Sequence, residues 1–285
     1  MSSEKKVSES PTAVLRVIRP RKGLARIDFA ELWRYRELFG FLTWRDILVR
    51  YKQTAIGIAW AVVRPVLTMV VFTVIFGRWA KLPSGGVPYP ILTFAALLPW
   101  QFFANSLTES SNSVVASSSM ISKIYFPRLI IPFAAVVSGV VEFLISCVIL
   151  AGLMIWYQIP VTAAIFWLPL FLLLALLCAL GIGLWFSALN VEYRDVRYIV
   201  PFLVQFGLYV SPVGFSSAIV PAKWRLLYSL NPMVGVIDGF RWALLGMKNT
   251  LYLPGLYLSI FMVMALFVSG VFYFKRMERS FADII

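Results

Sequence analysis

The sequence predicts an all-α integral membrane protein with six transmembrane helices, and three observations lead to this prediction. Hydrophobic residues make up 60% of the 285 residues and charged residues only 14%, whereas about a quarter of the residues of a soluble domain are charged. The mean hydropathy is +0.83. The apolar residues also gather into six runs, most of them long enough for the roughly 20 residues that cross a bilayer as a helix.

The N-terminal region precedes the first apolar run and has a different composition. Residues 1–28 are charged and rich in Ser, Pro and Arg, which predicts a tail,. Residues 29–42 predict an amphipathic helix that lies in the membrane interface or, alternatively, packs on the protein's own core. One face of this helix carries Phe29, Leu32, Trp33 and Phe39, and the other faces carry Glu31, Arg34 and Glu37. We therefore divide the chain into residues 1–52, a cytoplasmic tail with an interface helix, and residues 53–285, a six-helix transmembrane domain.

The six spans are expected at residues 55–78, 91–117, 132–157, 165–190, 198–214 and 253–274. The fifth run is short, and the segment 215–252 after it is broken at Asn231–Pro232, because a proline disfavours the helical conformation of the residue before it. Residues 218–230 and 234–245 are each too short to span. They predict a re-entrant external hairpin before the last span, buried against protein because unpaired backbone is not tolerated in lipid.

The distribution of lysine and arginine predicts the orientation of the spans. Nineteen of these residues fall in the segments that are inside when the N-terminus is cytoplasmic, and six fall in the outer segments, counting Arg78 at the outer end of the first span. Cytoplasmic loops carry the excess of positive charge. Both termini are therefore expected in the cytoplasm, and the net charge of +13 reflects topology and anionic lipid rather than nucleic acid.

The residue types that carry catalysis or bind metals are scarce. The sequence has no histidine, and Cys147 and Cys178 both lie in apolar runs, so we expect no metal site, no disulfide and no catalytic residue. A membrane-embedded glycan-modifying enzyme, the alternative class, needs a base or several gathered carboxylates. In the predicted outer segments the one acidic residue is Asp238, and Arg241 follows one helical turn later,.

Two short basic and aromatic segments, residues 120–132 and 190–201, interrupt the apolar runs on the predicted cytoplasmic side. Each is too short to be a domain. Each can form one or two helical turns that dock into a groove of a partner, or a plain turn whose Lys and Arg set the topology.

Three stretches carry a resemblance to a known family. They are "RDILVRYKQTAIGIAWAVVRP" (residues 45–65), "EYRDVRYIVPFLVQ" (residues 192–205) and "LNPMVGVIDGFRWALLG" (residues 230–246). Over roughly residues 29–280 the chain resembles the permease subunit of ABC-type polysaccharide exporters, which move lipid-linked O-antigen, capsule or teichoic acid polymers out of bacteria. One departure is Arg64, where an uncharged polar residue such as Gln is expected.

The resemblance implies a non-enzymatic subunit of the bacterial inner membrane. It works as a homodimer with two copies of an ABC nucleotide-binding subunit and moves an undecaprenyl-linked polysaccharide, with O-antigen expected first. The sequence has no G-x-x-x-x-G-K-[ST] phosphate loop,, so this chain needs no cofactor, and ATP and Mg are expected on the partner. The two cytoplasmic segments become coupling helices. Their contact residues are Ser122, Lys123, Tyr125, Phe126, Arg128, Glu192, Tyr193, Arg194, Asp195 and Arg197.

The predicted outer ends are rich in aromatic residues, which stack on sugar rings and also form interfacial belts. In the family the external hairpin gates the exit, and a rigid cap is the alternative. The expected pathway and gate residues are Phe76, Trp100, Phe103, Tyr209, Phe215, Tyr228, Asn231, Pro232, Phe240 and Arg241. The hydroxyl-rich stretch 105–119 suits either close helix packing or a sugar-lined passage.

Three charged residues, Arg64, Glu109 and Glu142, fall inside the first three predicted spans. Counted from the predicted inner ends at about 1.5 Å per residue, all three lie roughly 12–15 Å deep. Unpaired charges at that depth are costly. We expect Arg64 to pair with Glu109 or Glu142, within one subunit or across the dimer; the alternative is that each faces a water-filled channel.

Overall fold

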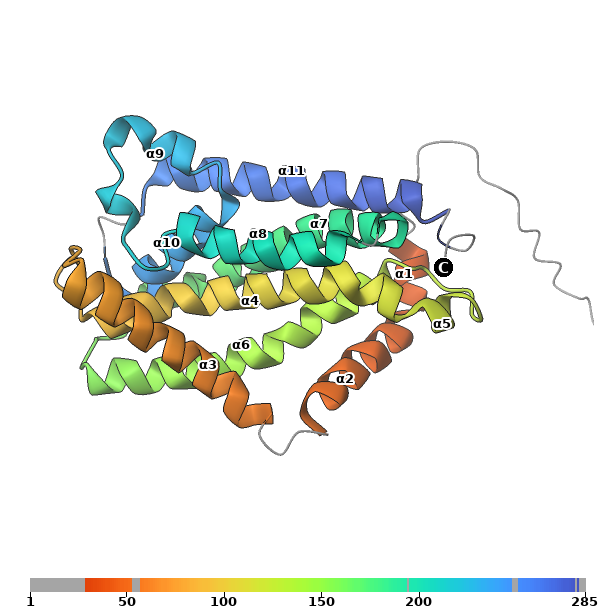
Figure 1. The fold of residues 1–285 in the computed structure, drawn as a ribbon, viewed down its shortest axis with the longest axis horizontal. Coiled ribbons are helices and arrows are strands. Elements are labelled where there is room, and N and C mark those ends of the chain that lie inside the picture. Colours follow the sequence, from red (N-terminus) through yellow and green to blue (C-terminus); the bar gives the residue numbers. More distant parts are fainter. Residues whose placement is uncertain (1–28, 53–56, 194, 248–250, 280, 282–285) are drawn as a thin grey trace, which may run out of the picture.

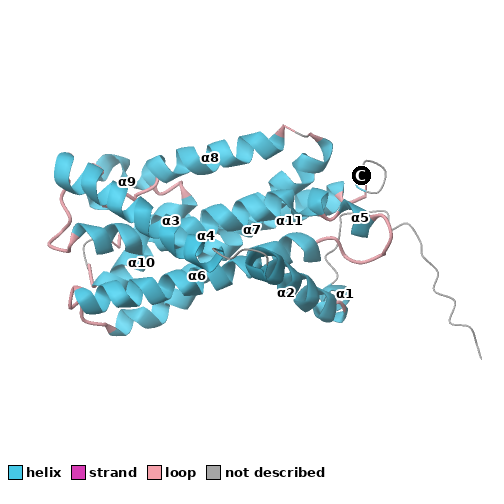
Figure 2. Cartoon of the chain, turned by 60° about the horizontal axis from the view of Figure 1, so that its bottom comes forward, coloured by secondary structure: helices cyan, strands magenta, loops and turns pink. Residues whose placement is uncertain are grey.

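The computed structural model describes residues 29–52, 57–193, 195–247, 251–279 and 281 (Figure 1). Over these residues the chain consists of helices joined by loops, without a strand (Figure 2). The elements are α1 (Phe29–Arg34), α2 (Arg36–Lys52), α3 (Gly57–Phe72), η1 (Thr73–Trp79), α4 (Tyr89–Ala116), α5 (Ser118–Ile121), α6 (Ile130–Trp156), η2 (Ala163–Trp167), α7 (Leu168–Glu192), α8 (Val196–Val210), η3 (Ser217–Ile219), α9 (Ala222–Tyr228), α10 (Pro232–Leu245) and α11 (Leu253–Met277).

Five helical segments in the described part of the chain are long and apolar enough to cross a membrane. They are Ala59–Trp79, Tyr89–Ala116, Ile130–Trp156, Ala163–Glu192 and Leu253–Met277. The protein is therefore an all-α, multi-pass membrane protein, as predicted. The fifth predicted span corresponds to α8, an apolar helix of 15 residues, so the count of six complete spans stays a prediction.

The helices form an elongated bundle with α4 at its centre (Figure 1). In the most apolar stretch of α4, 83% of the residues are buried, against at most 44% in the corresponding stretches of the other candidate spans. Helices α3, α6, α7, α8 and α10 all pack against it. At one end of the bundle lie α9 and α10, and at the other lie α1 and α5 (Figure 1). The segments that were predicted to be outer and inner thus fall at opposite ends.

The hydroxyl side chains of α4 explain how its neighbours come so close. Ser106 and Ser110 are fully buried and lie against glycines. A Cβ atom on Gly183 of α7 would meet the Ser110 Oγ at 2.5 Å, and one on Gly139 of α6 would meet the Ser106 Oγ at 2.8 Å. Small residues let helix backbones approach closely within a membrane. At these two serines the structure favours the packing alternative over the sugar-lined passage.

Helices α1 and α2 pack on the protein's own core on one side and leave aromatic side chains exposed on the other. Leu42 is buried, and Leu32 and Phe39 pack on the same core cluster, because α2 lies along α6. Trp33 and Trp44 are 71% and 60% exposed and stay available for a membrane interface. Residues 29–52 are therefore attached to the bundle rather than separate from it.

Candidate functional site

The fifth apolar segment contains a helix too short to cross a bilayer and ends in a buried loop. Helix α8 has 15 residues and rises about 22 Å, short of the roughly 30 Å hydrocarbon thickness. The chain continues as a non-helical loop whose residues Ser211 to Gly214 are buried. Non-helical backbone at this depth is tolerated only where protein satisfies its hydrogen bonds, so the partners of its carbonyl groups decide whether this loop can exist.

Three consecutive carbonyl oxygens of the loop receive side-chain donors. The Val213 oxygen accepts from Arg241 Nη2 at 2.9 Å, the Gly214 oxygen from the Tyr89 hydroxyl at 2.5 Å, and the Phe215 oxygen from Arg241 Nη1 at 2.6 Å. Arg241 Nε also donates to the Leu92 oxygen at 3.2 Å. One fully buried guanidinium therefore ties α10 to the first turn of α4 and to the end of the fifth segment.

Asp238 supplies the countercharge for Arg241. It lies one turn earlier on α10, it is buried, and its Oδ1 has no hydrogen-bond partner among the described residues. Burial raises the pKa of Asp238 to about 6, and the nearby Ser217 hydroxyl, Arg241 and Arg225 offset only part of that effect. Burial likewise lowers the pKa of Arg241 to about 10, with Asp238 acting in the opposite direction. Arg241 therefore remains charged at neutral pH, whereas Asp238 titrates slightly below neutral pH.

The predicted break at Asn231–Pro232 is present. The Asn231 side chain caps α10 by accepting from the Met233 amide at 3.0 Å, and it donates to the Ser211 Oγ at 2.9 Å. Pro232 is the first residue of the helix, where its missing N–H costs nothing. Helices α9 and α10 thus form a helical pair joined at this break, and the pair is anchored to the end of α8.

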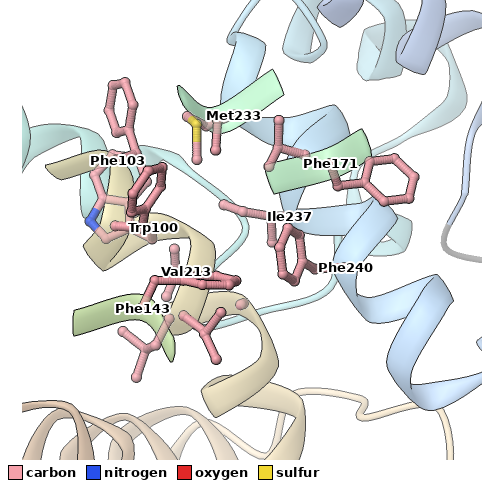
Figure 3. Packing of buried hydrophobic residues seen from close by; sticks show 14 of the residues in the cluster. Trp100, Phe103, Phe143, Phe171, Val213, Met233, Ile237 and Phe240 are labelled. Carbon is pink, nitrogen blue, oxygen red and sulfur yellow. The ribbon is translucent and has the colours of Figure 1, made fainter. Parts of the chain in front are cut away.

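The structure places part of the predicted pathway set in the core, so the role of these residues in a pathway stays a prediction. Trp100, Phe103 and Phe240 are buried in the main core, where Phe240 packs edge-on against Phe143 at 6.0 Å between ring centroids (Figure 3). Their rings already contact other side chains of the chain and offer no face to a substrate in this conformation. Of the other predicted aromatic residues, Tyr209 is exposed, whereas Phe76, Phe215 and Tyr228 are half-buried. Movement of the hairpin as a gate stays a prediction.

A charged cluster lies at the end of α2, and it corrects the expected pairing of Arg64 within the chain. Arg50 lies 3.4 Å from Glu109 and 3.4 Å from Glu142. Asn105 of α4 donates to Glu142 Oε2 at 3.2 Å. Arg64 is exposed on α3 and has no ion pair within the described residues. Arg50 replaces Arg64 because α2 packs along α6, a tertiary contact that no local pattern signals; pairing of Arg64 across a dimer stays a prediction.

The two expected coupling segments lie at the end of the bundle opposite the hairpin (Figure 1). In the first, Ser122, Lys123 and Tyr125 are exposed, Tyr125 by 77%, after the single turn of α5. In the second, the exposed residues are Glu192, Tyr193, Asp195 and Arg197, with Glu192 ending α7 and Arg197 in α8. Arg194 lies outside the described residues. The second segment is a tight link between two helices rather than a helix of its own.

Two residues of the first segment face the protein instead of a partner. Phe126 is buried in the core cluster of the inner end. The Arg128 backbone amide donates to Glu278 Oε1 at 3.0 Å, and its guanidinium donates to the Glu278 carbonyl. Glu278 also receives Lys275 Nζ at 2.8 Å. These two residues therefore fix the segment to the end of α11, and their role as docking contacts stays a prediction.

Acidic residues and cysteines do not gather elsewhere in the described part of the chain. Within it no group of three or more His, Cys, Asp or Glu residues could hold a metal ion. The polar features that remain are the Arg241 anchor, the Arg50 cluster and the exposed segment around Tyr125.

The described residues thus form a multi-pass helical membrane protein with a charged cluster between α2, α4 and α6. The chain belongs to the ABC-2 type transporter family, whose model matches residues 37–245.

Its similarity to curated relatives extends over most of both chains. It is 29% identical over 250 residues to the O-antigen export system permease protein RfbA of Klebsiella pneumoniae, covering 87% of this chain and 95% of the relative. The RfbA protein of Myxococcus xanthus is 26% identical over 74% of this chain and 81% of its own. The polysialic acid transport protein KpsM of Escherichia coli is 23% identical over 82% and 91%.

We predict that Arg241→Lys strongly destabilises the protein. A single ammonium group cannot reproduce the forked geometry that reaches three separate carbonyl oxygens, and each buried acceptor left unpaired costs about 1–3 kcal/mol. Tyr89→Phe removes one donor and should cost less. The midpoint of thermal unfolding in detergent measures both effects, with Arg78→Lys, at an exposed outer arginine, as the control. Equal midpoints for Arg241→Lys and Arg78→Lys would contradict the anchoring role of Arg241.

We predict that Asp238 makes the protein more stable in mild acid. Its pKa is about 6 in the folded chain and 3.8 in the ordinary case, so the folded state binds the proton more tightly than the unfolded state. The stabilisation is complete below the lower value and is lost as the pH rises through the higher one. Thermal unfolding at pH 5 and pH 8 should show a larger difference for the parent than for Asp238→Asn. An identical pH dependence of the two proteins would contradict this prediction.

Proposed function

We propose that this chain is the transmembrane subunit of an ATP-driven exporter that moves lipid-linked polysaccharide, with O-antigen as the cargo, across the bacterial inner membrane. The observation that carries the proposal is the similarity to O-antigen export permeases along nearly the whole chain. Capsular polysaccharide is the second candidate cargo, because KpsM and the capsule export protein CtrC of Neisseria meningitidis match at 23% identity. The higher identity to the RfbA proteins favours O-antigen.

ATP hydrolysis takes place in a separate nucleotide-binding subunit in this proposal. The sequence lacks a phosphate-binding loop, and the exposed Lys123, Tyr125 and Tyr193 supply basic and aromatic groups at the end of the bundle opposite the hairpin. Aromatic side chains are frequent anchors of protein interfaces. Two copies of this chain and two ATPase subunits form the exporter, with both termini and the docking surface in the cytoplasm.

The cargo is tested in cells that lack this protein. Deletion should remove the surface polysaccharide and cause its undecaprenyl-linked form to accumulate inside the cells, and restoring the parent gene should reverse both effects. Immunodetection of surface polymer and mass analysis of extracted lipid-linked glycan measure the two. Undiminished surface O-antigen together with lost capsule would transfer the proposal to capsule export, and unchanged levels of both would refute it.

The docking surface is tested in the same cells by Tyr125→Ala, which removes an exposed ring without disturbing the core. Loss of one interface anchor costs on the order of 1–2 kcal/mol, so export and the ATPase activity of the purified complex should each fall about tenfold. The matched control is Tyr257→Ala, because Tyr257 is 69% exposed near the start of α11, at the other end of the bundle. Parent-like export and ATPase activity of Tyr125→Ala would remove this residue from the docking surface.

A further inference from the structure

The most buried helix of the bundle has one uncovered strip, and every residue on it is polar. From Ile91 to Val114 of α4, all residues are buried except Gln101, Asn105, Thr108, Glu109 and Asn112. We call these five residues the open stripe. At 3.6 residues per turn they fall on one side of the helix, so the stripe is a continuous band of amide, hydroxyl and carboxylate groups.

The open stripe lies at a depth where contact with lipid is costly. Gln101 and Asn105 are near the middle of α4, and Glu142, which receives the Asn105 amide, is near the middle of α6. Ionisable and amide groups at mid-span face water, protein or a substrate rather than hydrocarbon. The exposed face of the same α6 carries Leu144 and Val148 instead, residues suited to lipid. The bundle therefore has a polar opening next to a lipid-type surface.

A small, shallow hollow adjoins this stripe. Its lining combines Gln101, Asn105, Glu142 and Ser146 with the rings of Phe102 and Phe143, which pack edge-on at 5.7 Å between centroids. Gly139 adds no side chain to the wall. A pyranose ring presents C–H groups on its faces and hydroxyl groups around its edge. The rings of Phe102 and Phe143 are buried in the core, so the amide, hydroxyl and carboxylate groups are the ones that offer partners, namely to the hydroxyl groups of a sugar.

The charges of the site determine which sugars fit. Arg50 lies 3.4 Å from Glu109 and 3.4 Å from Glu142, so its positive charge is opposed by two carboxylates. A phosphate or sialic acid unit would meet this excess of negative charge, which repels it. An uncharged sugar instead gains acceptors for its hydroxyl groups.

We propose that the open stripe and its hollow form a contact site for uncharged sugar units of the transported polymer. This inference rests on the proposed function and deepens it, because it assigns the contact to amide and carboxylate groups of α4 and α6 rather than to the aromatic outer ends. Arg50 positions Glu109 and Glu142 through its two ion pairs.

The test measures the access of a hydrophilic thiol reagent to Asn105→Cys in cells, in a Cys147→Ser, Cys178→Ala background. The reagent is a methanethiosulfonate with a trimethylammonium head. Labelling is compared between cells that cannot make the polymer and cells in which an ATPase-inactive partner stalls it. The matched control is Val148→Cys on the lipid-type face of α6, because Val148 is 73% exposed.

Asn105→Cys should be labelled readily without polymer and severalfold more slowly with stalled polymer, while Val148→Cys stays unlabelled in both. Gln101→Cys serves as a second position if Asn105→Cys does not accumulate. Absence of labelling at both stripe positions would overturn the proposal in favour of a second copy or lipid covering the stripe. Equal labelling with and without polymer would leave a wet surface that sugars do not contact, which also overturns it. Under both of these outcomes, export of polymer by the parent cells would still support the proposed function.

Discussion

The hydrogen bonds of the Arg241 guanidinium are the interaction on which the α9–α10 end of the molecule depends. The fifth segment stops being helical after Val210, and a chain in that position must satisfy its carbonyl groups without water. Arg241 and Tyr89 satisfy three consecutive ones. Because Arg241 also reaches Leu92, it ties together the loop after α8, helix α10 and the start of α4. Asp238 reduces the electrostatic cost of burying that charge.

Helix α4 has two different faces, one packed against neighbouring helices and one that carries the open stripe. Its serines allow α6 and α7 to approach through Gly139 and Gly183, which shields most of a polar helix from lipid. The open stripe is the part left without such cover. Arg50 enters at that point from α2, so the N-terminal helix pair contributes to the polar interior as well as to the membrane surface. At the inner end, the contact of Arg128 with Glu278 holds the exposed Tyr125 segment against α11.

Composition and periodicity sufficed for the helical membrane fold, the break at Asn231 and the exposed segment around Tyr125, because bilayer thickness and proline geometry act locally. They did not suffice for side-chain partners. Arg50 was assigned to the cytoplasmic region, and only the packing of α2 on α6 brings it to Glu109 and Glu142. Trp100 and Phe240 were predicted to line a passage, since an aromatic residue in the core and one facing a pore have the same sequence signature. Burial of Ser110, with Glu109 next to it exposed, is likewise decided by neighbouring helices.

The central claim is that the open stripe of α4 faces an aqueous, sugar-accessible space. Spin labels on Asn105→Cys and Val148→Cys, in proteoliposomes containing the exporter complex, test it through their relaxation by a water-soluble nickel chelate and by oxygen, which concentrates in lipid. The account predicts that the label at position 105 is relaxed mainly by the nickel chelate and the label at position 148 mainly by oxygen. Preferential relaxation by oxygen at both positions would contradict it.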